Sequence, residues 1–319
     1  MRVGIIGYGF IGKLHLLAWK GVEPKTTFCV IDPVLTDEIK LELEQRNIPY
    51  MDTFEKALAK YPDIQYISVC SPPNRHKEVV LRAAKENIHI LLEKPVSAVE
   101  SDYKTMKLAL SESKSKAMVG VTQRFYPEVI RGKKWIENGL IGDIISIQDI
   151  MILSDFGLPS WYNNPDISGG GIFICNGVHL LDRLKYLTGS EIEKLYDYKF
   201  KGPVRNEKIA SINGKLSGGV NVHLHLEWSE VEKRQELTIF GTKGRIEIST
   251  WDYARLYTKG GLEEVKPYKS GDSFNDRTLS GLVNEIKCFL DGVENTIPHE
   301  LTLEGHESII GTIWKTYQK

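Results

Sequence analysis

Three glycines near the start of the chain have a spacing that suits phosphate binding. The segment VGIIGYGFIGKLH contains Gly7, Gly9 and Gly12 in the pattern G-x-G-x-x-G, after an apolar run and before a helical pattern. In such a loop the first glycine permits a tight turn, the second lets the backbone approach a pyrophosphate, and the third lets helix and strand pack closely. The helix N-terminus, beginning around Phe10 and Ile11, would supply N–H groups and a partial positive charge. The segment predicts a dinucleotide site.

An acidic residue ends the next apolar run and indicates which dinucleotide is bound. Asp32 follows Gly12 by 20 residues, where a carboxylate can accept hydrogen bonds from the hydroxyls of the adenosine ribose. Its charge would repel a 2′-phosphate, and residues 33–35 include no arginine or serine to hold one. We therefore expect NAD rather than NADP. The alternative is a tight turn in which Asp32 caps the backbone.

Polar and charged residues also follow two later apolar runs, in the segments SPPNRH and LLEKP. In a doubly wound sheet, ligands bind beyond the carboxyl ends of the strands. The residues that we expect there to contact the cofactor are Ser71, Pro72, Asn74, His76, Glu93 and Lys94.

Lys94 is the candidate for proton chemistry at this edge. Beside a nicotinamide, its ammonium group could hydrogen-bond the reacting hydroxyl or carbonyl and stabilise or transfer its proton. The alternative is an exposed lysine that pairs with Glu93 at the end of a strand.

The segment GGGIFICNGVHLLD contains a cysteine, an asparagine and a histidine after three glycines. His179 could donate or accept the proton of a substrate oxygen. Cys175 could be a small buried hydrophobe, half of a thiolate pair with His179, or a zinc ligand together with His223 and His225. The sequence shows neither an oxyanion site nor further ligands at zinc spacing, so we expect no metal site.

The pattern of apolar residues indicates the elements that position these groups. Up to residue 121, short apolar runs alternate with helical segments, which predicts a parallel sheet of βαβ units. From about residue 144 the strand candidates alternate apolar with polar residues, which is typical of a sheet covered on one face. Helices are expected over residues 127–138 and 172–187 and near the end of the chain. We expect two domains, residues 1–121 and 122–319.

The charge balance bears on the class of partner, and the cysteine content bears on the cellular compartment. The chain has 41 Lys and Arg residues against 42 Asp and Glu residues, with no long run of one sign, so nothing indicates a nucleic acid or membrane partner. Four cysteines without CxxC spacing favour reduced thiols in a cytosol. The first residues indicate neither a signal peptide nor a membrane span, so we expect a cytoplasmic protein.

Five segments, in this order and over almost the whole chain, resemble a known family: GIIGYGFIGKLH, SPPNRH, LEKPVS, SGGGIFICNGVHLLD and TIFGTKGRIEI. The family is the glucose-fructose oxidoreductase and inositol dehydrogenase family, called Gfo/Idh/MocA. The resemblance implies an α/β fold, with an N-terminal Rossmann domain and a C-terminal α/β domain that contains a large, mostly antiparallel open sheet. It also implies NAD(P)-linked oxidation or reduction of sugars, inositols and related polyols.

The resemblance assigns the family's catalytic lysine to Lys94 and a second motif to Gly169–Gly171, Gly177 and His179. Where that motif has an aspartate, this chain has Cys175. An aspartate four residues before a histidine on a helix could orient the imidazole or bind a substrate hydroxyl, and a neutral thiol does both poorly. The departure bears on how the substrate is bound and on the proton relay.

Aromatic and amide side chains suit a polyol pocket, because sugar C–H faces stack on rings while hydroxyls need paired donors and acceptors. The candidates for substrate contact are Lys94, Gln123, Arg124, Tyr126, Trp161, Tyr162, Asn163, Asn164, Cys175, Asn176 and His179. Each could instead be structural, and Arg124 could brace a domain crossing. The broad sheet face of the second domain leads us to expect a homodimer or homotetramer.

Two alternatives to a dehydrogenase stay open. The first, also found in this wider fold group, is a lyase or glycosidase that uses bound NAD for transient oxidation. The second is a regulatory protein that binds NAD and sugar without turnover.

Overall fold

The computed structural model describes all residues except 155–157, 204, 232 and 319. The chain forms two compact units, and each is assembled from separate stretches of sequence. The first unit comprises residues 1–120 and 282–306, and the second comprises residues 121–281 and 307–319. The predicted division, 1–121 and 122–319, differs in that residues 282–306 return to the first unit.

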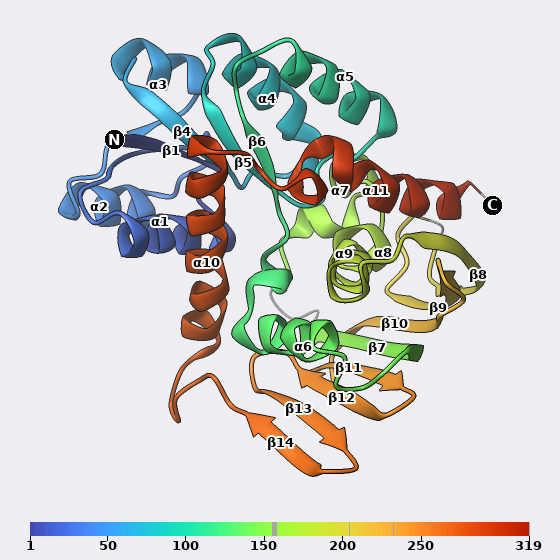
Figure 1. The fold of residues 1–319 in the computed structure, drawn as a ribbon. Coiled ribbons are helices and arrows are strands. Elements are labelled where there is room, and N and C mark those ends of the chain that lie inside the picture. Colours follow the sequence, from blue (N-terminus) through green and yellow to red (C-terminus); the bar gives the residue numbers. More distant parts are fainter. Residues whose placement is uncertain (155–157, 204, 232, 319) are drawn as a thin grey trace. The chain divides into compact units, whose positions relative to one another are not determined.

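The first unit is built on a six-stranded parallel sheet in the order β3-β2-β1-β4-β5-β6. Its strands are β1 (Arg2–Ile6), β2 (Thr27–Ile31), β3 (Tyr50–Met51), β4 (Ile64–Val69), β5 (His89–Glu93) and β6 (Ala117–Gly120). Its helices, where η marks a 3-10 helix, are α1 (Phe10–Val22), α2 (Asp37–Gln45), α3 (Phe54–Lys60), η1 (Pro73–Arg75), α4 (His76–Lys85) and α5 (Glu100–Ser111). Strand order reverses beside β1, so α1 lies on one face of the sheet and α4 and α5 lie on the other (Figure 1).

The apolar composition of these strands explains their position. In β1, β2 and β5 every residue after the first is buried, as expected for strands covered on both faces. The apolar runs of the first 121 residues, RVGIIG, TFCVID, QYISVCS, IHILLE and AMVGV, form β1, β2, β4, β5 and β6. Only the two-residue β3 has no counterpart in the prediction, because it is too short to show a pattern.

The second unit is built on an eight-stranded sheet in the order β14-β13-β12-β11-β7-β10-β9-β8. Its strands are β7 (Ile144–Ser154), β8 (Ile192–Lys201), β9 (Ile209–Leu216), β10 (Asn221–Ser229), β11 (Arg234–Gly241), β12 (Gly244–Ser249), β13 (Tyr253–Thr258) and β14 (Gly261–Val265). Strands β7 and β10 pair in parallel and the other neighbours pair antiparallel, so the predicted mostly antiparallel sheet is confirmed.

One face of this sheet is covered by helices. Buried and half-buried residues alternate along β9 and β10, and the apolar residues other than Ile209 are buried, which is the signature of a sheet with one covered face. The helices of this unit are η2 (Thr122–Phe125), α6 (Pro127–Glu137), η3 (Ser160–Asn163), α7 (Pro165–Ser168), α8 (Ile172–Cys175) and α9 (Gly177–Thr188). Helix α6 packs on β12, β13 and α9, and α8 packs on β9 and β10.

The helix predicted over residues 172–187 is interrupted. Helix α8 ends at Cys175, Asn176 leaves helical geometry with φ −125°, and α9 starts at Gly177. A Cβ at Gly177 would lie 2.5 Å from the ring of Phe173, so the glycine lets the second helix begin against that ring. The prediction of one continuous helix is therefore wrong at Asn176.

The C-terminal part of the chain crosses between the units twice. Helix α10 (Phe274–Glu294) has its first turns in the second unit and the rest in the first. After η4 (His299–Leu301), α11 (Leu303–Tyr317) makes the return. In the first unit, Phe289 packs edge-on against Trp19 at 6.2 Å, and Lys116 Nζ donates to carbonyls at the end of α10. Among the described residues, no helix is long and apolar enough to cross a membrane.

Candidate active site

The glycine loop joins β1 to α1 and leaves room for phosphates. Gly7 has φ +88°, donates its N–H to the carbonyl of Ile31 at 2.9 Å, and could not have a Cβ, which would lie 2.7 Å from the backbone N of Ser71. A Cβ on Gly12 would collide with the carbonyl oxygen of Gly7, so close packing of helix and strand requires glycine there. No atom lies within 4 Å of a Cβ built on Gly9. This open space at the start of α1 fits a dinucleotide pyrophosphate.

Asp32 connects this loop to the end of β2. Its Oδ2 accepts the backbone N–H of Tyr8 at 2.8 Å, and its Oδ1 accepts the backbone N–H of Val34 at 2.9 Å. A carboxylate has about four acceptor positions, so these bonds leave capacity for ribose hydroxyls. Asp32 therefore shapes the loop, as the capping alternative requires, and keeps the acceptors that cofactor binding needs.

The loop after β4 is braced by a histidine. His76 is buried, and its ring nitrogens lie 3.0 Å from the carbonyl oxygen of Val96 and 2.7 Å from that of Ser71. Burial lowers the pKa of His76. The imidazole is thus bonded to the backbone of this loop, while Ser71, Pro72 and Asn74 are partly exposed. Contact of these residues with the cofactor stays a prediction.

Glu93 and Lys94 end β5 in different environments. Glu93 is 6% exposed, its Oε1 lies 3.0 Å from Nε2 of His15, and its Oε2 accepts the backbone N–H of Lys94 at 3.2 Å. Lys94 is half-buried and joins Pro95 through a cis peptide bond. A surface pair between two exposed side chains does not describe this position, because the Glu93 carboxylate is buried against α1.

In the second unit, a buried carboxyl group that the sequence analysis missed holds the glycine turn before α8. A Cβ on Gly171 would lie 2.7 Å from the Cδ of Glu207, so the glycine makes room for this side chain. Glu207 Oε1 accepts the backbone N–H of Phe173 at 3.0 Å and the hydroxyl of Tyr317 at 2.7 Å. Burial raises the pKa of Glu207. Glu207 lies in a loop far from the motif in sequence, and no spacing rule connects the two.

Cys175 is fully buried at the end of α8, and its Sγ lies 3.7 Å from the carbonyl oxygen of Gly170. His179 is half-buried in the first turn of α9. The interruption at Asn176 places the two residues in separate helices, so the regular four-residue relationship expected within one helix does not apply. This burial is the environment that the small-hydrophobe interpretation of Cys175 requires.

Asn176 is held by an aromatic group. Its Oδ1 accepts the indole N–H of Trp228 at 3.0 Å, and the ring of Trp228 lies edge-on to Tyr162 at 5.7 Å. Tyr162 stacks on Trp161, with 4.0 Å between ring centroids. Trp228 was not predicted, although its place at the end of an alternating strand in HLHLEW was a signal that could have indicated it.

Other predicted substrate residues have their polar groups bonded within the second unit. Gln123 Nε2 donates to Oε1 of Gln235 at 3.1 Å. Arg124 is 3% exposed, and its Nε donates to Asp182 at 2.9 Å in a two-pronged pair. These contacts fix η2 on β11 and α9. They favour a structural role for both residues, and their contact with substrate stays a prediction.

Three further candidates lie nearby in the sequence. Tyr126 packs edge-on against Trp251 at 5.9 Å, Asn163 is exposed, and Asn164 accepts the backbone N–H of Asp166 at 3.0 Å to begin α7. None of these contacts assigns a substrate role.

His223 and His225 share one face of β10, because side chains two residues apart on a strand point to the same side. His223 Nδ1 lies 2.9 Å from Oδ1 of Asn213, and His225 Nε2 lies 3.5 Å from Oε2 of Glu227. Across the described part of the chain, the one group of three or more metal-ligand side chains that are close enough to hold an ion is His15, Glu93 and Glu285. A zinc site that joins Cys175 to the two histidines has no support there.

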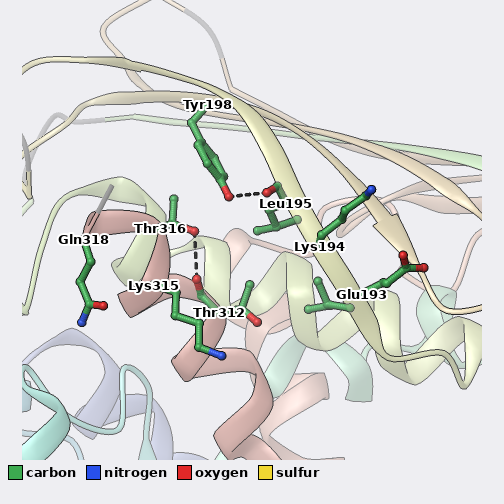
Figure 2. A pocket seen from close by; sticks show the side chains of 9 residues that line it. Glu193, Lys194, Leu195, Tyr198, Thr312, Lys315, Thr316 and Gln318 are labelled. Atoms are coloured by element: carbon green, nitrogen blue, oxygen red, sulfur yellow. Dashed lines mark hydrogen bonds between the residues drawn. The ribbon is translucent and has the colours of Figure 1, made fainter.

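A cavity of about 500 Å³ lies between β8 and α11 (Figure 2). The Tyr198 hydroxyl donates to the carbonyl of Leu195, and the Thr316 hydroxyl donates to that of Thr312. None of the predicted site residues lines this cavity.

Comparison with known proteins identifies the family to which both domains belong. The profile described as "Oxidoreductase family, NAD-binding Rossmann fold" matches residues 1–121, and the GFO/IDH/MocA C-terminal domain matches residues 129–247. The myo-inositol 2-dehydrogenase of Thermotoga maritima is 28% identical over 314 residues, which cover 93% of this chain and 90% of that enzyme.

Two further proteins are similar over most of the chain. The 2,7-anhydro-N-acetylneuraminate hydratase of Escherichia coli is 25% identical over 304 residues, covering 90% of this chain and 78% of the hydratase. The solved structure of levoglucosan dehydrogenase in complex with NADH and L-sorbose has a TM-score of 0.85 at 20% identity, covering 100% of this chain and 97% of that one. At this identity, the structural likeness establishes the fold.

Proposed function

Because the chain belongs to the Gfo/Idh/MocA oxidoreductase family, whose first domain is an NAD-binding Rossmann fold, we propose that it is an NAD-dependent oxidoreductase of sugars, inositols or related polyols. The observation that carries the proposal is the cradle at Gly7, Gly9 and Gly12, with Asp32 beside it and Lys94 at the end of β5. Similarity to a myo-inositol dehydrogenase over 93% of the chain supports a polyol as substrate.

NAD held by the loop of Gly7, Gly9 and Gly12 would supply hydride transfer at a CH–OH carbon of the substrate. Lys94 hydrogen-bonds the oxygen on that carbon and accepts its proton on oxidation or returns it on reduction. His179, a half-buried imidazole in the first turn of α9, is the second group that can exchange this proton. Asn176 and the rings of Trp161, Tyr162 and Trp228 supply the amide and aromatic surfaces that a polyol needs.

The experiment that tests this function is NADH formation measured by absorbance across a panel of inositols, sugars and sugar nucleotides. The Lys94→Ala variant should lose about 10²–10⁴-fold in kcat while still binding NAD. Lys56→Ala is the matched control, because Lys56 pairs with Asp52 on the surface. If the wild type and Lys94→Ala are equally silent while both ligands bind, the protein is a sensor rather than an enzyme.

Similarity to a hydratase over 90% of the chain favours one second candidate function. This candidate is a lyase or glycosidase that would use bound NAD for transient oxidation, with no net NADH formed. Cofactor that copurifies with the protein, together with product formation without net NADH, would favour this candidate over a dehydrogenase. Mass analysis of products would detect a mass change of one water.

We further propose that the protein is a homodimer or homotetramer in a reducing cytoplasm. The face of the eight-stranded sheet that carries His223 and His225 is half-exposed along β10, and Phe240 on β11 is 39% exposed. The four cysteines are all among the described residues and none forms a disulfide, which suits a reducing compartment. Light scattering at working concentration tests the assembly, and a monomeric mass would contradict it.

A further inference from the structure

We propose that a buried chain of hydrogen bonds, running from Trp19 through Ser68 and His15 to Glu93, positions Lys94 for its role in the reaction. The inference rests on the proposed function, because it concerns how the proton-transferring lysine is held. It assigns His15 and Glu93 as positioning residues, although neither is required to touch the substrate.

The hydrogen bonds of this buried series are short, and all lie within the first unit. Trp19 Nε1 donates to Ser68 Oγ at 2.8 Å, and Ser68 Oγ lies 3.1 Å from His15 Nδ1. His15 Nε2 lies 3.0 Å from Glu93 Oε1, and Glu93 Oε2 accepts the Lys94 backbone N–H at 3.2 Å. His15, Trp19 and Ser68 have no exposed surface. The network therefore links helix α1 and strand β4 to the backbone on which Lys94 sits.

The chemistry of each group determines which partner donates and which accepts along this series of hydrogen bonds. An indole N–H can only donate, so Ser68 Oγ is an acceptor toward Trp19 and can direct its own hydrogen to His15 Nδ1. The imidazole proton then resides on Nε2 and is donated to Glu93. Glu93 ends the chain as a carboxylate that accepts from both His15 and the Lys94 amide. Each donor in this arrangement has one acceptor, which buried polar groups require.

A third titratable side chain completes the cluster. Glu285, on the part of α10 that belongs to the first unit, is fully buried, and its ligand atom lies within 4.8 Å of those of His15 and Glu93. Glu285 therefore places a second buried carboxyl group beside the hydrogen bond between His15 and Glu93. Cys70 faces the same groups, and burial together with Glu93 and Glu285 raises the pKa of its thiol.

The same three side chains could be taken for a metal site, but their bonding argues against it. Both ring nitrogens of His15 and both oxygens of Glu93 already have hydrogen-bond partners. An ion would have to break the bond between His15 and Glu93. Close packing at the end of β6 also confines the carboxylate, since a Cβ on Gly120 would lie 3.3 Å from Glu93 Oε1.

The test compares three variants in steady-state kinetics and NADH binding. His15→Leu removes the donor to Glu93 and should lower kcat about tenfold or more, while the Kd for NADH changes less than twofold. His15→Gln keeps an N–H donor near the position of Nε2 and should recover most of kcat. Tyr103→Phe is the control, since it removes another buried hydrogen bond of this unit, to the carbonyl of Leu303, and should leave kcat unchanged.

A measurement without turnover separates this inference from the proposed function. The proposed series of hydrogen bonds, here called the relay, requires His15 to be the neutral tautomer with its proton on Nε2. In protein labelled with ¹⁵N-histidine, the His15 resonances should show this tautomer, and Ser68→Ala should perturb them. A proton on Nδ1, or equal loss of kcat in His15→Leu and His15→Gln, would overturn the relay. Stoichiometric metal in the purified protein, lost in Glu285→Gln, would also overturn it. If the relay signals are present but no polyol is turned over, only the proposed function fails.

Discussion

The carboxylate of Asp32 accepts a 2.8 Å hydrogen bond from the backbone N–H of Tyr8, which lies between the first two glycines of the cofactor loop. The residue expected to read the ribose therefore also holds the loop that cradles the phosphates. The proposed function therefore couples cofactor selection and loop geometry in one side chain.

This coupling predicts two effects of Asp32→Ala. The KM for NAD should rise tenfold or more and the preference over NADP should narrow, because the acceptor for ribose hydroxyls and the negative charge are both removed. Stability should also fall by about 1–3 kcal/mol, because two backbone N–H groups lose their acceptor. Kinetics with both cofactors and urea unfolding measure these effects, and exposed Asp37→Asn is the control. Unchanged cofactor preference would refute the role of Asp32 in NAD selection.

Trp228 is predicted to act on substrate binding through Asn176. Trp228→Phe keeps most of the ring but removes the N–H that donates to Asn176 Oδ1 at 3.0 Å. The KM for the polyol should rise severalfold, while NADH binding, measured by fluorescence titration, should not change. Equal KM values for variant and wild type would show that Asn176 does not depend on this bond.

Arg124 is predicted to matter for stability more than for substrate. Arg124→Met would leave the buried Asp182 carboxylate without its partner, which typically costs about 3–5 kcal/mol. Urea unfolding should show this loss, whereas Arg131→Met, which breaks an exposed pair with Glu263, should cost less than about 1 kcal/mol. A stable Arg124→Met protein with a raised KM for polyol would instead support the substrate role.

The buried carboxyl group of Glu207 predicts a pH dependence of stability. Burial raises its pKa, so the folded protein keeps this proton to a higher pH than the unfolded chain. The contribution of Glu207 to the free energy of unfolding is complete below the pKa of Glu in the unfolded chain, about 4.3. It is lost as the pH rises through the pKa of Glu207 in the folded protein. Glutamine does not titrate, so the Glu207→Gln variant does not lose stability in this way. Its stability relative to wild type should therefore improve from pH 4 to pH 7.

Chemical unfolding across that pH range measures the difference for Glu207→Gln. Glu193→Gln provides the comparison, because Glu193 is an exposed residue of β8. Wild-type and Glu207→Gln curves that stay parallel at all pH values would contradict the assignment.

Cys175 is predicted to be a packing residue. Cys175→Ala should keep near-normal turnover and lose about 1 kcal/mol of stability, since only one small buried group is removed. Neither wild type nor variant should contain stoichiometric zinc. Loss of turnover by more than tenfold in a folded variant would instead support thiolate chemistry with His179.

Much of the fold could be predicted from periodicity. The runs that became β1, β2, β4, β5 and β6 are apolar because both faces of their sheet are covered, and the alternation in β7, β10 and β11 reflects one covered face. The glycine loop could be predicted from the G-x-G-x-x-G spacing, in which Gly7 and Gly12 each need glycine for a separate local reason, while Gly9 lies beside open space.

The contacts that fix the site could not be predicted in the same way. Glu207 reaches Gly171 from a distant loop, and His15 reaches Glu93 across 78 residues of sequence. Such pairs depend on how elements pack, which periodicity does not specify. The helix break at Asn176 was missed because Gly177 looks like an ordinary helix position until the ring of Phe173 lies beside it.

The path of the chain through residues 282–306 limits how this protein can be cut or recombined. A recombinant fragment ending at residue 121 would contain every glycine of the cofactor loop and still lack Phe289, which packs against Trp19 and Tyr66. It would also lack Glu285 beside His15. A chimaera that exchanges cofactor preference with a relative must therefore transplant two separate stretches of gene.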